Sequence, residues 1–305
     1  MDWSRQPYLE QVRGDTYCIV TPFVRIPLFR LDRTHAVLMD SGLHWNREGI
    51  CRVLDQEGIQ LRAILTSHAH IDHTGNHRFL QERYGAVLCM SPFDAAISCN
   101  PLGMTAYLCG GTYEGTKAYA QSMFCRADRL LDRKRGRVEI DGASFRLLEL
   151  DGHAPEHLGF VTPDGVAYLG DTLMSRDVLE QVRIPYCTSC QVDLESKRRA
   201  AGLSFPCYVL AHNGVCDTIQ DLVRQNVDSL LNKIQAVADQ ADRYRTEADL
   251  IWASQTALGA QAHTVEKVRT AEQNLRSYIG YLTDNGVLTA RVRDGRLEYI
   301  RTELA

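Results

Sequence analysis

The stretch that most constrains the fold of this chain is residues 66–73, which read Thr-Ser-His-Ala-His-Ile-Asp-His. Three histidines and one carboxylate fall within six of these residues: His68, His70, Asp72 and His73. Residues 59–65 before them are largely apolar and predict a strand, and residues 74–84 after them have the pattern of a helix. The cluster therefore lies at the carboxyl end of a strand, where open α/β sheets place their chemistry.

The same arrangement recurs further along the chain. Strands are predicted at 145–150, 166–169 and 208–211, and each is followed at once by a residue that can bind a metal: His153, Asp171 and His212. Carboxyl ends of strands in one pair of sheets meet at one edge, so five histidines and two aspartates are expected to gather there. Imidazole and carboxylate are suitable ligands for two divalent cations.

Two nearby residues have more than one interpretation. The strand predicted at 36–39 ends in Asp40-Ser41-Gly42, which on its own is only a turn signal. His157 follows His153 by four residues. It either supports the site from behind or faces the substrate, or else it makes an ordinary structural hydrogen bond.

The ordered string His68-x-His70-x-Asp72-His73, followed by His153, Asp171 and His212, resembles the metallo-β-lactamase superfamily over about residues 12–215. The resemblance implies an α/β fold, the αββα sandwich of that superfamily. It also implies that His68, His70 and His153 hold one metal, that Asp72, His73 and His212 hold a second, and that Asp171 bridges both. Asp40 would support these ligands, and His157, which by family position is not itself a ligand, remains a candidate for such a supporting role. A histidine at position 70, where flavodiiron relatives have glutamate, disfavours di-iron redox chemistry.

The implied activity is metal-dependent hydrolysis, with a bridging hydroxide on a di-zinc centre and with Asp72 orienting or accepting a proton. Iron or manganese would also fit the same ligands. The expected substrate is a small thioester, ester or lactone, as in glyoxalase-II-like and lactonase-like members. One alternative is a nuclease or phosphodiesterase, which predicts a basic groove that the sequence does not display. Another is a non-catalytic regulatory protein, which the intact ligand set disfavours.

The chain is expected to divide into a catalytic domain, residues 1–216, and a mostly helical, winged-helix-like module, residues 217–305. Within the first, glycine- and aromatic-rich residues 91–128 predict either a lid or pocket wall, or a helical insertion that packs on the surface. In the second, Asp294-Gly295 between alternating runs predicts a hairpin. Residues 264–301 carry a net charge of only +2, so we expect the module to form a pocket wall or a homodimer contact rather than bind nucleic acid.

Composition narrows the setting of the protein. The net charge of −4 does not suggest a nucleic-acid or membrane partner. The first residues do not form a signal peptide, and no apolar run approaches the roughly 20 residues that span a bilayer. We therefore expect a cytoplasmic protein with ten reduced cysteines. Four of them, Cys18, Cys51, Cys89 and Cys207, are expected in the core; Cys187-x-x-Cys190 is either structural or has a metal, redox or pocket role.

Overall fold

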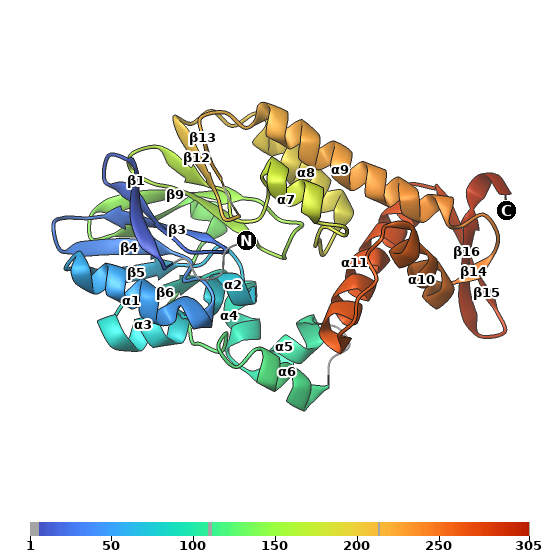
Figure 1. Cartoon of the computed structure of the whole chain (residues 1–305), viewed down its shortest axis with the longest axis horizontal. Helices are drawn as coiled ribbons and strands as arrows, with labels where there is room; N and C mark the ends of the chain where they lie inside the picture. The colour runs from blue at the N-terminus through green and yellow to red at the C-terminus, as the bar shows by residue number, and fades with distance from the viewer. Residues whose placement is uncertain (1–5, 109–111, 213, 305) are drawn as a thin grey trace.

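The computed structural model of the chain describes residues 6–108, 112–212 and 214–304. Two β-sheets and their covering helices form the larger part of the molecule, and a helical module with a small sheet lies at the far end (Figure 1). Within the described residues, no helix is both long and apolar enough to cross a membrane.

The first sheet has its seven strands in chain order. They are β1 (Tyr8–Arg13), β2 (Thr16–Val20), β3 (Arg25–Arg30), β4 (His35–Met39), β5 (Gln60–Leu65), β6 (Val87–Met90) and β7 (Arg129–Leu130). Strands β1 to β4 pair antiparallel, whereas β4 to β7 pair parallel. The carboxyl ends of β4 and β5 therefore lie at the same edge.

The second sheet has the order β13-β12-β11-β10-β9-β8. Its strands are β8 (Arg137–Ile140), β9 (Ala143–Glu149), β10 (Leu158–Val161), β11 (Val166–Tyr168), β12 (Cys207–Leu210) and β13 (Gly214–Cys216). Strand β10 is antiparallel to both β9 and β11, and β11 is parallel to β12. Strands β9, β11 and β12 therefore end at one edge, as the sequence predicts for the loops that carry His153, Asp171 and His212.

Alternation of side chains along the strands builds an αββα sandwich. In β5, Ala63 and Leu65 join a core that contains buried residues of both sheets, whereas Ile64 joins a core shared with the outer helices. Helices α1 (Arg47–Gln56) and α3 (His77–Tyr84) cover the first sheet, and α8 (Cys190–Ala200) and α9 (Gln220–Asp239) cover the second. The predicted sandwich is confirmed, and Cys18, Cys51, Cys89 and Cys207 are core residues as expected.

The insertion, residues 91–128, contains three short helices. They pack against residues 66–73, which we call the histidine-rich loop. They are α4 (Pro92–Ser98), α5 (Pro101–Tyr107) and α6 (Tyr113–Tyr119), and residues 109–111 lie outside the described part. Helices α4 and α5 begin with proline at their first position, after Ser91 and Asn100 side chains that cap backbone N–H groups. Met104 and Met123 share a small core with Ala69, so the insertion touches the loop directly.

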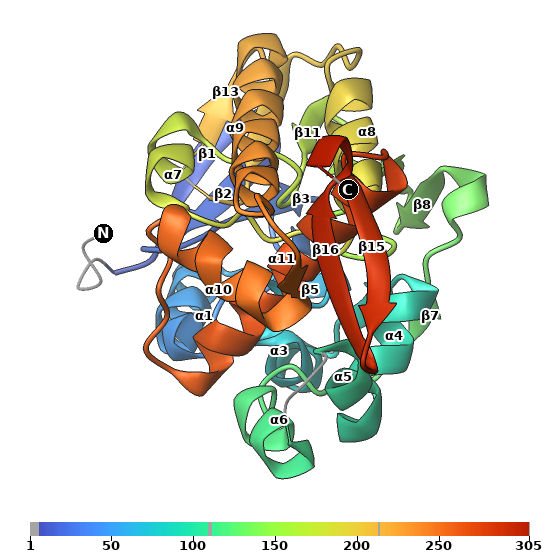
Figure 2. The same ribbon diagram turned by 90° about the vertical axis from the view of Figure 1, so that its right-hand side faces the viewer.

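The C-terminal part consists of α9, β14 (Arg245–Thr246), α10 (Glu247–Ala257), α11 (Val265–Asp284), β15 (Leu288–Arg293) and β16 (Arg296–Arg301). The hairpin β15–β16, prominent in Figure 2, turns at Asp294 and Gly295, which both have positive φ as a two-residue hairpin turn requires. The hydrophobic core of this C-terminal part includes Leu194 of α8, so the module packs on the sandwich without a separating linker. The order of elements agrees with a winged helix, and that assignment stays a prediction.

Three local differences from the sequence prediction have clear reasons. The helix expected from residue 74 is two helices, α2 (Ile71–Thr74) and α3, because Asn76 turns to donate to the carbonyl oxygens of Ser41 and Leu43. Strand β1 was not predicted; it pairs at the sheet edge and has no fully buried residue. Helices α7 (Arg176–Gln181) and α8 also lack a clear apolar pattern in the sequence.

Candidate metal centre

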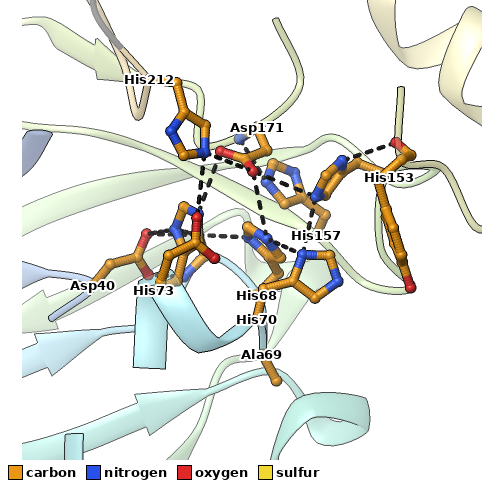
Figure 3. Close-up of polar contacts among 12 residues, drawn as sticks. Asp40, His68, Ala69, His70, His73, His153, His157, Asp171 and His212 are labelled. Atoms are coloured by element: carbon orange, nitrogen blue, oxygen red, sulfur yellow. Dashed lines mark hydrogen bonds and ion pairs between the residues drawn. The ribbon is translucent and has the colours of Figure 1, made fainter. Parts of the chain in front are cut away.

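The seven side chains singled out in the sequence converge in space, and Figure 3 shows His68, His70, His73, His153, Asp171 and His212 turned toward one another. They form two groups of potential ligands, each with its ligand atoms within 4.8 Å of one another. We call the first the histidine group: His68, His70, His153 and Asp171. We call the second the carboxylate group: Asp72, His73, Asp171 and His212. Asp171 belongs to both.

In the histidine group, ring nitrogens face one another across short distances. Nδ1 of His70 lies 2.9 Å from Nε2 of His68 and 3.1 Å from Nε2 of His153. Burial, opposed in part by nearby carboxylates, lowers the pKa of His70 to about 4. Burial also lowers the pKa of His68 and of His153 well below the ordinary value, and the other histidines add to the shift. The three rings are therefore neutral at pH 7 and present lone pairs to a common point.

In the carboxylate group, negative charge faces imidazole. Nε2 of His212 lies 3.3 Å from a carboxylate oxygen of Asp72 and 3.3 Å from one of Asp171. Burial would raise the pKa of Asp72, but the neighbouring His73 and His212 outweigh it and hold that pKa at about 2. Burial would lower the pKa of His212, but the two carboxylates outweigh it and raise that pKa to about 10. The group therefore favours positive charge at its centre.

The ring nitrogen of each histidine that faces away from its group has a fixed partner. The five contacts are His68 Nδ1 to Ser67 Oγ at 3.0 Å, His70 Nε2 to Tyr107 hydroxyl at 3.0 Å, His73 Nδ1 to Asp40 at 2.8 Å, His153 Nδ1 to Tyr186 carbonyl at 3.1 Å and His212 Nδ1 to Phe23 carbonyl at 3.1 Å. Such partners fix the tautomer and the ring orientation, so that the opposite nitrogen is free to bind a cation.

Asp40 lies behind the site, as the resemblance implied. Its carboxylate accepts hydrogen bonds from the backbone N–H and hydroxyl of Ser67, from His73 and from the hydroxyl of Tyr168, at 2.6–2.8 Å. Burial opposes ionisation of Asp40, but His73 and these hydrogen bonds hold its pKa below the usual value. Asp40 also has a φ of 64°, uncommon for a residue other than glycine. The turn thus directs a charged carboxylate at His73, and the contribution of Tyr168 was not predicted.

His157 is fully buried, and it makes hydrogen bonds to the backbone on either side of the site while its ring packs against that of His68. Its Nδ1 donates to the Leu150 carbonyl at 3.1 Å, and its Nε2 accepts from the Asp171 N–H at 3.3 Å. Gly170 makes this approach possible, because it has a φ of 52° and a Cβ there would lie 2.5 Å from Nε2 of His157. His157 therefore makes the expected structural hydrogen bond, and because this bond lies directly behind Asp171, a supporting role for His157 stays a prediction.

The sequence did not predict one contact between two segments of the site. His77, in the segment predicted as a helix, is fully buried and lies 2.8 Å from Thr66 Oγ1 and 2.7 Å from Ser41 Oγ. It therefore joins the histidine-rich loop to the Asp40 turn. The adjacent Asn76 also turns inward, and the strong polar character of both residues gave no sign of burial.

The residues present fit a pair of cations. Nε2 of His73 and Oδ1 of Asp171 are buried and lie 3.3 Å apart, yet neither makes a hydrogen bond within the described part of the chain. Leaving such groups without partners is costly, and a cation between them would satisfy both. The neutral imidazoles, the two carboxylates and the fixed outer nitrogens form a donor set suited to zinc, iron or manganese.

A cavity of about 680 Å³ opens onto both groups. His70, Asp72, His153, Asp171 and His212 form its floor. Leu108 and residues 112–123 of the insertion, residues 174–186 around α7, and residues 265–273 of α11 contribute to its walls. The insertion is therefore part of the pocket wall, and the C-terminal module reaches the same pocket.

Cys187 and Cys190 lie behind this wall. Their Sγ atoms are 3.1 Å apart, both side chains are buried, and they pack with Ser277 of α11. Neither lines the cavity or belongs to a ligand group found among the described residues. The structure thus favours the structural interpretation over a metal or pocket role, and a redox role stays untested.

Comparison with known proteins gives a consistent picture. The family model described as the metallo-beta-lactamase superfamily matches residues 27–212. Hydroxyacylglutathione hydrolase GloC from Haemophilus influenzae is 26% identical over 143 residues, 47% of this chain and 63% of that protein. A hydroxyacylglutathione hydrolase from Chromohalobacter salexigens is 28% identical over 141 residues, 46% of this chain and 43% of that protein. The chain thus spans less than two thirds of the length of either relative.

A solved structure resembles the whole chain. The metallo-beta-lactamase family protein TTHA1429 from Thermus thermophilus superposes with a TM-score of 0.71 at 20% identity, covering 97% of this chain and 98% of that one. The similarity therefore includes the insertion and the C-terminal module, and it concerns the fold.

Proposed function

The chain belongs to the metallo-β-lactamase superfamily, and on that basis we propose that it is a metal-dependent hydrolase that cleaves a small thioester, ester or lactone. The observation that carries the proposal is the pair of ligand groups that share Asp171 at the floor of a cavity. Such an arrangement is suited to activating water next to a bound carbonyl compound.

In this proposal His68, His70 and His153 hold one divalent cation, Asp72, His73 and His212 hold a second, and Asp171 contacts both. When bound, two such cations, most readily zinc for this donor set, supply Lewis acidity and lower the pKa of water. Asp40, from behind His73, and His157, from behind Asp171, keep the ligands in place.

Asp72 has a second role in the proposed reaction. Its carboxylate lines the cavity and its low pKa, about 2, keeps it ionised at neutral pH. An ionised carboxylate beside the attacking water would accept a hydrogen bond from that water and orient it.

Acyl transfer to water is favoured over the two alternatives by specific observations. The relatives with the name hydroxyacylglutathione hydrolase support a thioester. A nuclease or phosphodiesterase would need cations along its pocket, whereas Arg269 is the single lysine or arginine among the described residues that line the cavity. A purely regulatory protein would have no use for two complete ligand groups.

The proposal extends to the organisation of the chain. Residues 1–216 would form the catalytic domain and residues 217–305 a winged-helix-like module that supplies one wall of the pocket through α11. A cytoplasmic location with reduced thiols and assembly as a homodimer are further parts of the proposal.

The test is a metal analysis combined with a substrate screen. Purified protein would be assayed for zinc, iron and manganese, and then with acyl thioesters, esters, lactones, phosphodiesters and RNA, before and after chelation. We expect metal-dependent hydrolysis of a carbonyl substrate, with a loss of about 10²-fold or more in Asp171→Ala. Hydrolysis of phosphodiesters alone, or full activity and metal content in Asp171→Ala, would contradict the proposal.

A further inference from the structure

We propose that the cavity binds an uncharged, apolar acyl group of medium length, with its carbonyl carbon at the two ligand groups. This inference rests on the proposed hydrolase function and names its substrate class. It is carried by the residues of the walls and by the arrangement of charge around the opening.

Part of the cavity lining is aliphatic. Its walls include Ile71 beside the histidine-rich loop, Met123 of the insertion, and Met174, Val178, Val182 and Ile184 around α7. None of these side chains carries charge or a strong hydrogen-bonding group. Methionine adapts to irregular apolar shapes, so the two methionines suit a flexible chain. Polar side chains, among them Thr116, Gln181 and Gln273, also line the walls, and at the floor His70, His153 and Asp171 are placed to meet a carbonyl group.

The charge around the cavity disfavours an anionic acyl or leaving group. Arg269 of α11 is the single basic side chain other than histidine among the described lining residues, and its NH1 lies 3.1 Å from Glu272. Glu266 lines the same wall. A glutathione thioester carries two carboxylates, and an unpaired cation to receive them is absent from the described lining. A neutral thioester needs none.

The size of the cavity sets the expected dependence on chain length. A volume of about 680 Å³ lies within the range of small-molecule sites and leaves room beyond an acetyl group. Transfer of one methylene from water into an apolar site is worth about fourfold in an equilibrium constant. Because the acyl chain of the substrate is distant from the bond that is cleaved, this gain in binding should appear in kcat/KM until the acyl chain fills the cavity.

The experiment uses metal-loaded protein and a series of N-acetylcysteamine thioesters from acetyl to dodecanoyl. We expect kcat/KM to rise by about threefold to fourfold per methylene and then level off, and we expect the glutathione thioester of the best acyl group to be a poorer substrate than the neutral one. A flat or falling series, or a clear preference for the glutathione thioester, would overturn the inference.

A substitution in the cavity wall, compared with a matched substitution on the surface, tests where the acyl chain binds. Val178→Trp would fill part of the cavity and move the best substrate to a shorter chain. Val292→Trp on the hairpin β15–β16, where the side chain is 74% exposed, should leave the series unchanged. Circular dichroism would first show that both variants are folded. An unchanged chain-length optimum in a folded Val178→Trp protein would count against the proposed location.

Binding of alkyl methyl ketones to chelator-treated protein separates this inference from the proposed function. These ketones carry a carbonyl and a chain but no bond that the enzyme could cleave, and calorimetry reports their Kd directly. Tighter binding with longer chains supports the inference even if no substrate is hydrolysed, an outcome that would contradict only the proposed function. Binding that does not depend on chain length would overturn the inference even in an active enzyme.

Discussion

The hydroxyl of Tyr107 lies 3.0 Å from Nε2 of His70, so the insertion contacts a member of the histidine group directly. The carbonyl oxygen of Tyr107 in turn lies 3.5 Å from the side-chain nitrogen of Gln273 in α11. The insertion and the C-terminal module are thereby connected to the proposed metal centre through one tyrosine. Because Nδ1 of His70 faces the other ligands, the contact with Tyr107 fixes which nitrogen of His70 is available.

Tyr107→Phe should therefore weaken cation binding while it leaves the fold intact. Loss of such an outer partner costs about 10- to 100-fold in metal affinity, and phenylalanine keeps the ring in its place. Competition with a chromophoric chelator would measure the affinity. Tyr113→Phe, an exposed position in the same insertion, is the matched control. Equal affinities in the two variants would show that Tyr107 does not position His70.

Substitutions in the two ligand groups should remove cations in a predictable pattern. We expect about two equivalents in the unaltered protein, about one in His153→Ala and in His212→Ala, and less than one in Asp171→Ala, because Asp171 is shared. Elemental analysis after dialysis gives these numbers. His35→Ala, outside both groups, should keep the full content. Retention of both cations by Asp171→Ala would contradict the shared role.

Gly170→Ala should destabilise the protein more than an ordinary glycine substitution at positive φ. Gly58→Ala is a matched control, because Gly58 has a φ of 63° but a Cβ added there would have no atom within 4 Å, whereas a Cβ at Gly170 would meet His157. Both should lose roughly 1 kcal/mol from the backbone, and Gly170→Ala a further 1–3 kcal/mol or so from overpacking. Urea denaturation measures the difference, and equal losses would mean that the loop shifts freely away from His157.

Asp94 should make the stability depend on pH. Its side chain is buried beside Ala69 and Ser91, and burial raises its pKa to about 8 from an ordinary value of 3.8. Between these values the unfolded chain is ionised and the folded chain is protonated. Unfolding therefore releases a proton, and the free energy of unfolding falls as pH rises from about 4 to about 8, by up to about 1.4 kcal/mol per pH unit.

Asp94→Asn keeps the shape of the side chain and removes this titration. The difference in unfolding free energy between the unaltered protein and Asp94→Asn should then shift in favour of the variant as pH rises from 5 to 8. Other titrating groups, the proposed ligands included, contribute equally to both proteins and cancel. A difference that does not change with pH would show that Asp94 is ionised throughout in the folded protein.

Four candidate ligands of the site could be predicted because each of them follows a strand. His68, His153, Asp171 and His212 each occupy a loop that follows a predicted strand, and such strands are indicated by short apolar, β-favouring runs bounded by turn residues. The αββα sandwich was expected from the family resemblance of the ordered ligand string. Membership of the superfamily agrees with what those strands and ligands indicated.

The supporting contacts could not be predicted, because they depend on how separate segments pack. Tyr107 is 37 residues from His70, and Tyr168 is 128 residues from Asp40. Nothing local distinguishes either tyrosine from a core residue. Likewise, the burial of His77 follows from the bend at Gly75, where a Cβ would lie 2.7 Å from the Ile71 carbonyl. The spacing of apolar residues along a helix does not reveal such a close approach.

Both ligand groups draw on both sheets. His68 and Asp72 follow a strand of the first sheet, whereas His153, Asp171 and His212 follow strands of the second. A cation held in either group would therefore cross-link segments far apart in the chain and restrict the unfolded ensemble, much as a covalent link does. In a cell short of the metal, more of the newly made protein would be open to proteases. The amount of this protein would then follow the supply of its metal as well as the rate of its synthesis.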